Sequence, residues 1–382
     1  MKKQTAALFA AAVLVFALAA CSAADSSGDS SLSGSSAVQS AEESTVDLEG
    51  LFTDRDLRQE ADTSGAKTLQ AASGKTDTIS EEGVYILTGE AENYTVRIEA
   101  GKKAKVQLVL DGLNVTNQDF PVIYDVSAGK CFITTAAGGG TLSVTGTFRS
   151  DGSVKTDAVI FGRDDLVLNG TGTLSLTSKA GNGISGKDEL RITGGTYQID
   201  SALHSIEAND MIAVSGGTFS LHAGKDGLHT KNNDDDTLGS VIIKGGTFTI
   251  ESDSDAVHAV TKFQMDAGSL QITAHEAIEA TMIEINAGSL SIHASDDAFN
   301  AAHKSKIYDA PCITFNGGTT VIVMEDGDND ALDSNGDIII NGGTLDITTT
   351  GSAFDYAGSA QFNGGKILLN GTEISEIPES TK

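Results

Sequence analysis

The chain has 382 residues, with 53 acidic against 25 basic side chains and a formal net charge of −28. A surface this acidic repels phosphate backbones, so nucleic acid is excluded as a partner. Hydrophobic residues make up 39% of the chain, too many for a disordered acidic protein. The 43 glycines and only 3 prolines indicate many tight turns between ordered segments.

The chain begins with a pattern typical of a bacterial lipoprotein leader. Two lysines precede an apolar stretch at 6–20, which is too short to span a membrane as a mature helix. The stretch ends in LAAC at 18–21, which resembles a lipobox. We therefore expect residues 1–20 to be a signal peptide. We expect Cys21 to bear the lipid that anchors the protein, outside the cytoplasm, to the bacterial cell membrane. An ordinary secretory signal is the alternative.

Composition also predicts the domain boundaries. Residues 21–50 begin at the lipidated cysteine and are rich in Ser, which favours a flexible tether. A folded domain is expected over 51–375 and a short C-terminal tail over 376–382. The two other cysteines, Cys131 and Cys312, lie in apolar runs, so we interpret them as buried free thiols.

The folded domain is a repeat of one phrase, in which an apolar residue and a glycine pair precede a short alternating segment. Successive second glycines are separated by 20 to 30 residues, and most intervals are close to 22. Segments such as 247–250 alternate apolar and polar residues, as strands do. The copies lie at 192–197, 214–219, 243–248, 285–290, 315–319, 340–345 and 362–365. This period predicts an all-β parallel β-helix with three short strands in each coil of about 22 residues.

Two of the intervals are longer than the rest and contain insertions. The first insertion covers 231–236 and the second covers 303–308. Both follow the same point of the coil, so we expect both loops to leave the same side of the helix. Loops of this kind are a common position for function in solenoids.

A second phrase follows each glycine pair by about nine residues and places polar residues around one inward apolar residue. These polar positions predict two outward columns along the helix. The first column is Asp226, Asp255, Glu276, Asp297 and Asp330. The second column is His229, His258, Glu279, Asn300, Asp333 and Asp355.

Carboxylates stacked at strand spacing repel one another, by about 3 kcal/mol for each pair at an effective dielectric constant near 20. Either some of them are protonated or cations lie between them. Oxygen ligands at this density suit Ca²⁺, which takes 6–8 oxygens, and Asp296 can add further oxygens. Zinc is disfavoured because no cysteine lies near the columns. The alternatives are acids that only cap turns and solvate the outer face, and histidines (His204, His229 and His258) that are ordinary surface residues.

Three segments resemble the signature of a family of bacterial carbohydrate-binding parallel β-helices, typified by a clostridial cell-surface protein that binds cellulose and pectic polysaccharide. They are SDDAFN at 295–300, DALDSNGDI at 330–338 and AFDY at 353–356. The resemblance covers about 50–370 and implies a right-handed β-helix similar to pectate lyases, with several bound Ca²⁺ ions. It implies metal ligands where this chain has suitable oxygens, at Glu276, Glu279, Asp296, Asp297, Asn300, Asp330, Asp333 and Asp355.

Two classes of function compete. The favoured one is a monomeric cell-surface lipoprotein whose Ca²⁺ ions bridge to an extracellular polysaccharide, either pectin and polyuronate or a cellulose-like chain. Asp226, Asp255, Tyr308 and Tyr356 are further candidates for substrate contacts. The enzymatic alternative is pectate-lyase-like β-elimination, for which Lys304 or Lys306, close in sequence to Asp297, could supply the base. We expect binding rather than catalysis, and a passive stalk or adhesin is a third possibility.

Overall fold

A computed structural model describes residues 50–327 and 329–380, and this part of the chain consists of strands, turns and bends. Its 36 strands confirm the predicted all-β fold. No helix within the described ranges is long and apolar enough to span a membrane. The predicted signal peptide, Cys21 and the tether up to residue 49 lie outside the described residues, so these expectations stay predictions.

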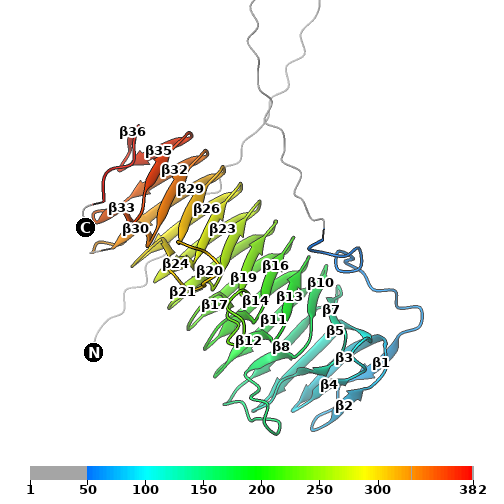
Figure 1. The fold of residues 1–382 in the computed structure, drawn as a ribbon. Helices are drawn as coiled ribbons and strands as arrows, with labels where there is room; N and C mark the ends of the chain where they lie inside the picture. The colour runs from blue at the N-terminus through cyan, green and yellow to red at the C-terminus, as the bar shows by residue number, and fades with distance from the viewer. Residues whose placement is uncertain (1–49, 328, 381–382) are drawn as a thin grey trace, which may run out of the picture. The chain divides into compact units, whose positions relative to one another are not determined.

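The described domain is a parallel β-helix whose coils stack along one axis (Figure 1). One strand of each coil joins a 12-stranded sheet, here called the site sheet, and the other two join a 24-stranded sheet. A representative coil contains β21 (Asp255–Ala259), β22 (Lys262–Met265) and β23 (Ser269–Ala274). Each of these strands pairs in parallel with the strand three places further along the chain. The pairing confirms the predicted three-stranded coil.

The site sheet also contains β2 (Thr76–Ile79), β4 (Thr95–Glu99), β6 (Ile123–Ser127), β9 (Ala158–Gly162), β12 (Asn182–Gly186), β15 (Ile206–Ala208), β18 (Leu228–Thr230), β24 (Glu276–Ala280), β27 (Phe299–Ala301), β30 (Asp330–Ser334) and β33 (Ser352–Tyr356). The larger sheet contains β1 (Lys67–Gln70), β3 (Gly83–Glu92), β5 (Lys105–Asn117), β7 (Lys130–Thr135), β8 (Gly140–Val144), β10 (Leu166–Gly170), β11 (Thr173–Ser178), β13 (Glu189–Ile192), β14 (Thr196–Ser201), β16 (Met211–Val214), β17 (Thr218–Ala223), β19 (Ser240–Ile243), β20 (Thr247–Ser252), β25 (Met282–Ile285), β26 (Ser289–Ala294), β28 (Cys312–Phe315), β29 (Thr319–Met324), β31 (Asp337–Ile340), β32 (Thr344–Thr348), β34 (Ala360–Phe362), β35 (Lys366–Leu369) and β36 (Thr372–Ile374). The long strand β5 pairs with both β7 and β8, so this one strand occupies two of the three strand positions of its coil.

The interior of the helix is filled by apolar side chains that repeat from coil to coil. Alternation along each strand turns every second side chain inward. The rings of Phe219 and Phe248 stack with their centroids 4.2 Å apart and their planes 5° from parallel. In the site sheet, the inward residue beside the polar positions is fully buried at Leu228, Val257, Ile278, Phe299 and Leu332. These anchors hold the neighbouring polar side chains on the outer face.

Both predicted buried thiols are confirmed. Cys131 and Cys312 are buried and unbonded to any other cysteine in the described residues. Burial raises the pKa of the Cys131 thiol well above its usual value, and burial also raises that of Cys312. Both side chains therefore act as small apolar core residues.

The repeated glycine station turns the chain between two strands of the larger sheet. The second glycine of the phrase has a positive φ at Gly195, Gly217, Gly246, Gly268, Gly288, Gly318, Gly343 and Gly365. In the coil before Gly195 the two glycines are Gly170 and Gly172, and the positive φ, 120°, is that of Gly170. At Gly343 both the backbone conformation and the space around the residue require glycine. Its φ is 84°, and a Cβ atom there would lie 2.7 Å from backbone atoms of Gly317 in the coil before.

Replacing this glycine is therefore expected to be costly. Gly343→Ala should lower the free energy of unfolding by about 2–3 kcal/mol, because alanine is strained at this φ and its methyl group meets backbone of the preceding coil. Chemical denaturation followed by circular dichroism measures the change. The matched control is Gly65→Ala, where a Cβ atom has open space and φ is not positive. Equal stability of the two variants would contradict the proposed constraint.

One carboxylate is buried inside the helix, far along the site sheet from the predicted columns. Asp125 on β6 is fully buried, and neither of its oxygens makes a hydrogen bond of normal geometry. Burial first, and then the neighbouring carboxylate of Asp164, raise its pKa to about 7. The backbone N–H of Asp164 and the charge of Arg163 offset only part of this rise. The folded state therefore favours the protonated form of Asp125.

This shift predicts a pH dependence of stability with a definite sign. The pKa in the unfolded chain is about 3.9, so the free energy of unfolding should fall as pH rises from about 4 to about 7. Asp125→Asn should remove up to about 4 kcal/mol of this loss, making the variant more stable than the native chain at pH 8 and similar to it at pH 4. Denaturant unfolding at several pH values measures it, with the exposed Asp54→Asn as control. A native-like pH profile for the Asp125 variant would refute the assignment.

Candidate functional site

Strand register confirms that the predicted second column is one continuous line on the site sheet. Its members pair directly from coil to coil. In order along the helix they are Glu207, His229, His258, Glu279, Asn300, Asp333 and Asp355. Neighbouring strands are about 4.8 Å apart, so each polar group lies within reach of the next.

The first column is linked by hydrogen bonds that cross from one coil to the next. The backbone N–H of Asp255 donates to Oδ1 of Asp226 at 3.2 Å, and that of Asp330 donates to Oδ1 of Asp297 at 3.2 Å. A first-column side chain therefore accepts a hydrogen bond from the chain of the following coil. The alternative interpretation of these acids, as caps of backbone groups, holds for Asp226 and Asp297.

The coil that contains His204 does not place this histidine beside His229. Ile206 pairs with Leu228, so Glu207 occupies the second column and His204 the first. His204 accordingly accepts a long contact of 3.4 Å from the backbone N–H of Asp226. Counting one period of 22 residues back from His229 and Asp226 would have found both positions. His204 is thus part of the column and mostly buried, not a plain surface histidine.

The histidine end of the columns is a stack of three imidazoles. The ring centroids of His204 and His229 are 4.1 Å apart, and those of His229 and His258 are 4.9 Å apart. Oδ2 of Asp226 lies 3.1 Å from Nδ1 of His204 and 2.6 Å from Nδ1 of His229. Nδ1 of His258 lies between Asp255 Oδ2, at 2.8 Å, and Glu279 Oε2, at 2.7 Å. The carboxylates at this end are therefore matched by nitrogen groups.

The pKa values at this end follow from the same contacts. Burial alone would raise the pKa of Asp226, but hydrogen bonds from His204 and His229 outweigh it and hold that pKa well below its usual range. Burial lowers the pKa of His229 and outweighs its contact with Asp226. For His258, burial also acts to lower the pKa, but hydrogen bonds to Asp255 and Glu279 raise it to about 9. At neutral pH His258 is charged and His229 is neutral.

Two carboxyl groups further along the columns, those of Glu276 and Asp297, lack this compensation. Burial, with the nearby charges of Asp255 and Glu279, raises the pKa of Glu276 to about 8. Burial and Asp296 raise the pKa of Asp297 to about 7. Oxygens of Asp255, Glu276 and Glu279 lie within 4.8 Å of one another. The carboxyl groups of Glu276 and Asp297 therefore exist as mixtures of protonated and charged forms near neutral pH. The stacking of acids predicted that some of them would be protonated.

Asn300 adds an amide to the acidic end. Its Nδ2 donates to Oε2 of Glu276 at 3.1 Å, whereas its Oδ1 is buried and makes no hydrogen bond. A buried acceptor without a donor is costly unless a donor or a cation reaches it. The oxygens gathered here form a donor set of the kind that hard cations prefer.

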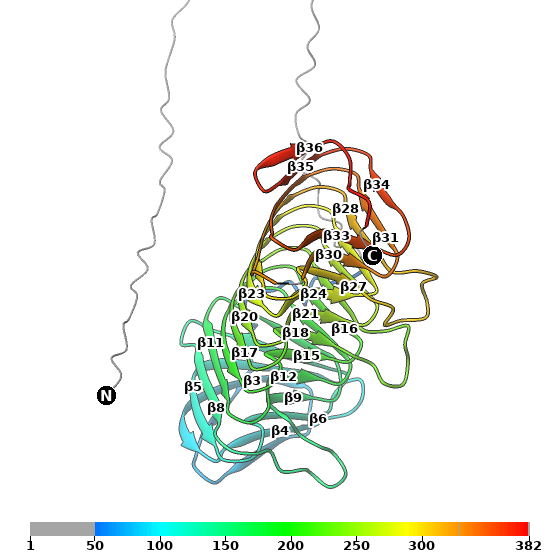
Figure 2. The ribbon, with the colours of Figure 1, turned by 90° about the vertical axis from the view of Figure 1, so that its left-hand side faces the viewer.

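The two insertion loops leave the same side of the helix, as predicted (Figure 2). The hydroxyl of Ser305 donates to the backbone carbonyl of Asp236, and Lys306 Nζ lies 3.7 Å from an oxygen of Asp236. The second loop also reaches the columns, because Lys304 Nζ lies 2.6 Å from Oε1 of Glu279. Of the two lysines predicted as a possible base, Lys304 is therefore paired with an acid of the second column, whereas the side chain of Lys306 is exposed.

Comparison with known proteins identifies the family. The family model of carbohydrate-binding domain-containing proteins matches residues 73–328 and 284–381. The chain belongs to this family. A relative from Acetivibrio thermocellus, also described as a carbohydrate-binding domain-containing protein, is 32% identical over 124 residues, which is 32% of this chain and 43% of the relative. The match thus spans less than half the length of that protein.

A solved structure supports the fold of this carbohydrate-binding family member. It is described as the structure of the polysaccharide lyase-like protein from C. thermocellum, gadolinium derivative. It superposes with a TM-score of 0.52 and 26% sequence identity, over 59% of this chain and 96% of that chain. The likeness agrees with a β-helix of the polysaccharide-lyase type.

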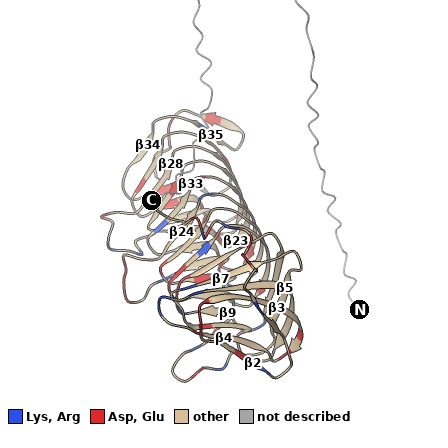
Figure 3. Cartoon of the chain, turned by 90° about the vertical axis from the view of Figure 1, so that its right-hand side faces the viewer, with Lys and Arg blue, Asp and Glu red and all other residues tan. Residues whose placement is uncertain are grey.

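The remaining predicted site residues lie at the C-terminal end of the columns or beside them. Asp333, Asp355 and Tyr356 line one hollow together with Ser380. Acidic residues, coloured red in Figure 3, lie on and beside β33. Ser380 donates to Oδ1 of Asp355 at 2.6 Å, and the hydroxyl of Tyr356 donates to the carbonyl of Pro378 at 3.2 Å. The last residues of the described chain therefore cover this end of the second column.

Three further predicted residues occupy less central positions. Asp330 lies in the first column and pairs with Ser352 of the next coil. Asp296 is more exposed and lies 3.7 Å from Nδ1 of His275, beside Glu276. Tyr308 is half-buried on the second insertion loop, and no contact that we describe joins it to the columns.

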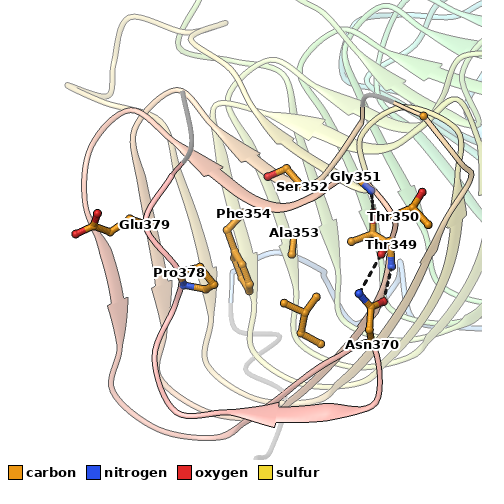
Figure 4. Close-up of a pocket in the computed structure, with 11 residues that line it drawn as sticks. Thr349, Thr350, Gly351, Ser352, Ala353, Phe354, Asn370, Pro378 and Glu379 are labelled. Atoms are coloured by element: carbon orange, nitrogen blue, oxygen red, sulfur yellow. Dashed lines mark hydrogen bonds between the residues drawn. The ribbon is translucent and has the colours of Figure 1, made fainter.

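A separate hollow lies between the last coils and the C-terminal tail (Figure 4). Asn370 and Thr349 join its walls through two hydrogen bonds of 3.0 Å between side-chain amide and backbone. Among the described residues that line it, Glu379 is the only charged one. These lining residues therefore do not form a cluster of acids and histidines like that of the columns.

Proposed function

We propose that this protein binds an extracellular polysaccharide through Ca²⁺ held at the acidic end of the two columns. The observation on which the proposal rests is the cluster around the half-buried Glu276, whose pKa is raised to about 8 and whose Oε2 accepts a hydrogen bond from Asn300, while Oδ1 of Asn300 is buried without a hydrogen-bond donor. A divalent cation would stabilise the charged carboxylates and satisfy the amide oxygen.

The residues present fit such an ion. Glu276 and Asn300 supply oxygens at the centre of the cluster, and Asp296 and Asp297 supply oxygens from the coil of Asn300. Glu279, whose two oxygens contact His258 and Lys304, would join this ligand set by exchanging one of these contacts for the ion. Asp330, Asp333 and Asp355 continue the two columns and extend the proposed ligand set toward the C-terminal end. When bound, Ca²⁺ would supply open coordination positions for carboxylate or hydroxyl oxygens of a sugar.

The cation also explains how an acidic protein could hold an acidic polymer. With a net charge of −28, the chain repels a polyuronate unless the charge between them is bridged. The family description, which is of carbohydrate binding, supports a sugar as the second partner.

The proposed setting is the outer face of the bacterial membrane. The leader pattern at 1–20 and Cys21 support a lipid anchor, and the Ser-rich segment that follows supports a tether that holds the β-helix away from the bilayer. The expected monomeric state stays a prediction.

Binding is a better proposal than catalysis for this site. A lyase needs an uncharged base at the C5 proton of a uronate. Nζ of Lys304 lies 2.6 Å from Oε1 of Glu279, so this nitrogen is already paired with a carboxylate of the second column. The lyase alternative therefore has no observation of its own in its favour, and it is included below as an outcome of the binding test.

The calcium proposal predicts a metal-dependent melting temperature. EDTA should lower the thermal midpoint of the full chain and added Ca²⁺ should restore it, since an ion bound only to the folded state stabilises it. Glu276→Gln should abolish the response to Ca²⁺. It should leave the metal-free protein at least as stable, because it removes a half-buried carboxyl group that is repelled by neighbouring acids. Glu251→Gln, on an exposed position of β20, should respond as the native chain does. An EDTA-insensitive midpoint would refute calcium binding.

The sugar proposal predicts chelator-sensitive retention on an acidic polysaccharide. The full chain should bind immobilised polygalacturonate in Ca²⁺ and elute in EDTA, and Glu276→Gln should not be retained. A glycan array with and without Ca²⁺ would identify the polymer if polygalacturonate fails but another sugar binds. Ultraviolet absorbance of the unsaturated product, followed with polygalacturonate in solution, tests catalysis in the same samples. Growth of that absorbance would favour the lyase, and retention unaffected by EDTA would overturn the metal bridge.

A further inference from the structure

The histidine end of the columns has a chemistry that the calcium proposal does not use. His204, Asp226 and His229 offer two imidazole nitrogens and one carboxylate oxygen, all within 4.8 Å of one another. They line an open hollow on the site sheet together with Asp255 and His258. Nitrogen ligands are a poor match for Ca²⁺ and a good match for zinc-like ions.

The contacts of His204 are frustrated without a bound ion. Nδ1 of His204 lies 3.1 Å from Oδ2 of Asp226, an acceptor, and 3.4 Å from the backbone N–H of the same residue, a donor. A protonated Nδ1 satisfies the carboxylate but opposes the N–H. An unprotonated Nδ1 accepts the long N–H contact but presents its lone pair to the closer carboxylate oxygen. Neither form suits both neighbours, whereas a cation beside the oxygen and the lone pair would remove the repulsion between them.

We propose that His204, Asp226 and His229 form a binding site for a divalent transition-metal ion of the zinc class, with one coordination position open to the hollow. Two histidines and one carboxylate, with a fourth position left for water or a ligand, are a known ligand set for zinc. Ligand atoms around a tetrahedral Zn²⁺ at about 2.0–2.1 Å lie roughly 3.3 Å apart. The 3.1 Å separation of His204 Nδ1 from Asp226 Oδ2 is close to this value. The 2.6 Å distance from His229 Nδ1 to the same oxygen would have to lengthen when the ion binds.

The surroundings hold the ligands in place, as they do in established metal sites. Oδ1 of Asp226 accepts the backbone N–H of Asp255 at 3.2 Å, which leaves Oδ2 facing the two imidazoles. Nε2 of His204 lies 4.0 Å from Oε2 of Glu207, so a small turn of the ring would give this nitrogen a carboxylate partner. Outer partners of this kind fix the orientation of metal-bound histidine. Paired histidines can bind zinc without cysteine, so the absence of cysteine near the columns does not exclude a zinc-class site here.

The test is a metal titration of the full chain after removal of metal with a chelator. Calorimetry with Zn²⁺, in the presence of excess Ca²⁺, should show one ion bound for each chain. Co²⁺ should give intense visible absorption, which indicates a site with few ligands. His229→Gln and His204→Asn should each weaken Zn²⁺ binding by at least the 10- to 100-fold loss seen even for outer partners of metal ligands.

Two features of the chain provide matched variants. Asn182 occupies the position of His204 one coil earlier, where its Oδ1 accepts the backbone N–H of His204 at 3.0 Å. His204→Asn should therefore keep the backbone contact while removing the imidazole, and circular dichroism checks that it folds. His222→Gln is the control on an exposed histidine of β17 and should bind Zn²⁺ as the native chain does.

The outcomes separate this site from the calcium proposal. Glu276→Gln should lose the response to Ca²⁺ but bind Zn²⁺ normally, so either proposal can fail alone. Absence of Zn²⁺ binding, equal binding by His229→Gln and the native chain, or displacement of Zn²⁺ by a similar concentration of Ca²⁺ would each overturn the zinc-class site.

Discussion

Parallel pairing between successive coils is the constraint on which the rest of this structure depends. Each strand hydrogen-bonds to the same strand of the coils before and after it, so equivalent residues form straight lines about 4.8 Å apart. In such a line, equivalent side chains must either pack favourably against one another or have their mutual repulsion offset by other groups. Inside the helix the lines are apolar, and rings such as Phe219 and Phe248 stack face to face. On the outer face, the same pairing brings polar groups close together even where their charges repel.

The two columns show two ways of meeting that constraint. Toward the middle of the helix, Asp226, Asp255 and Glu279 are matched by imidazoles or by Lys304, so their charges are compensated within the protein. Further along, Glu276 and Asp297 have mainly other acids as neighbours, and their pKa values rise to about 8 and about 7. One surface thus offers a nitrogen-rich end and an oxygen-rich end, which suit different classes of cation.

The insertion loops add what a regular repeat cannot supply. The coil repeats position side chains only in lines, whereas the second loop brings Lys304 back across the surface to Glu279 and ties itself to the first loop at Asp236. The C-terminal tail acts similarly at the last coil, where Ser380 and Pro378 contact Asp355 and Tyr356. Both additions therefore adjoin the columns.

The sequence by itself determined the all-β repeat, the three-stranded coil, the glycine corners, the buried thiols and the second column, because each depends on a short period that is visible in the residues. It did not determine the register of the coil that contains His204, in which Glu207, three residues further along the chain, lies beside His229. Nor could it show which acids are compensated, since Asp226 meets His204 and His229, and Glu279 meets Lys304, only after coils stack and a loop folds back. Charge compensation depends on distances between coils, and only the tertiary structure decides those.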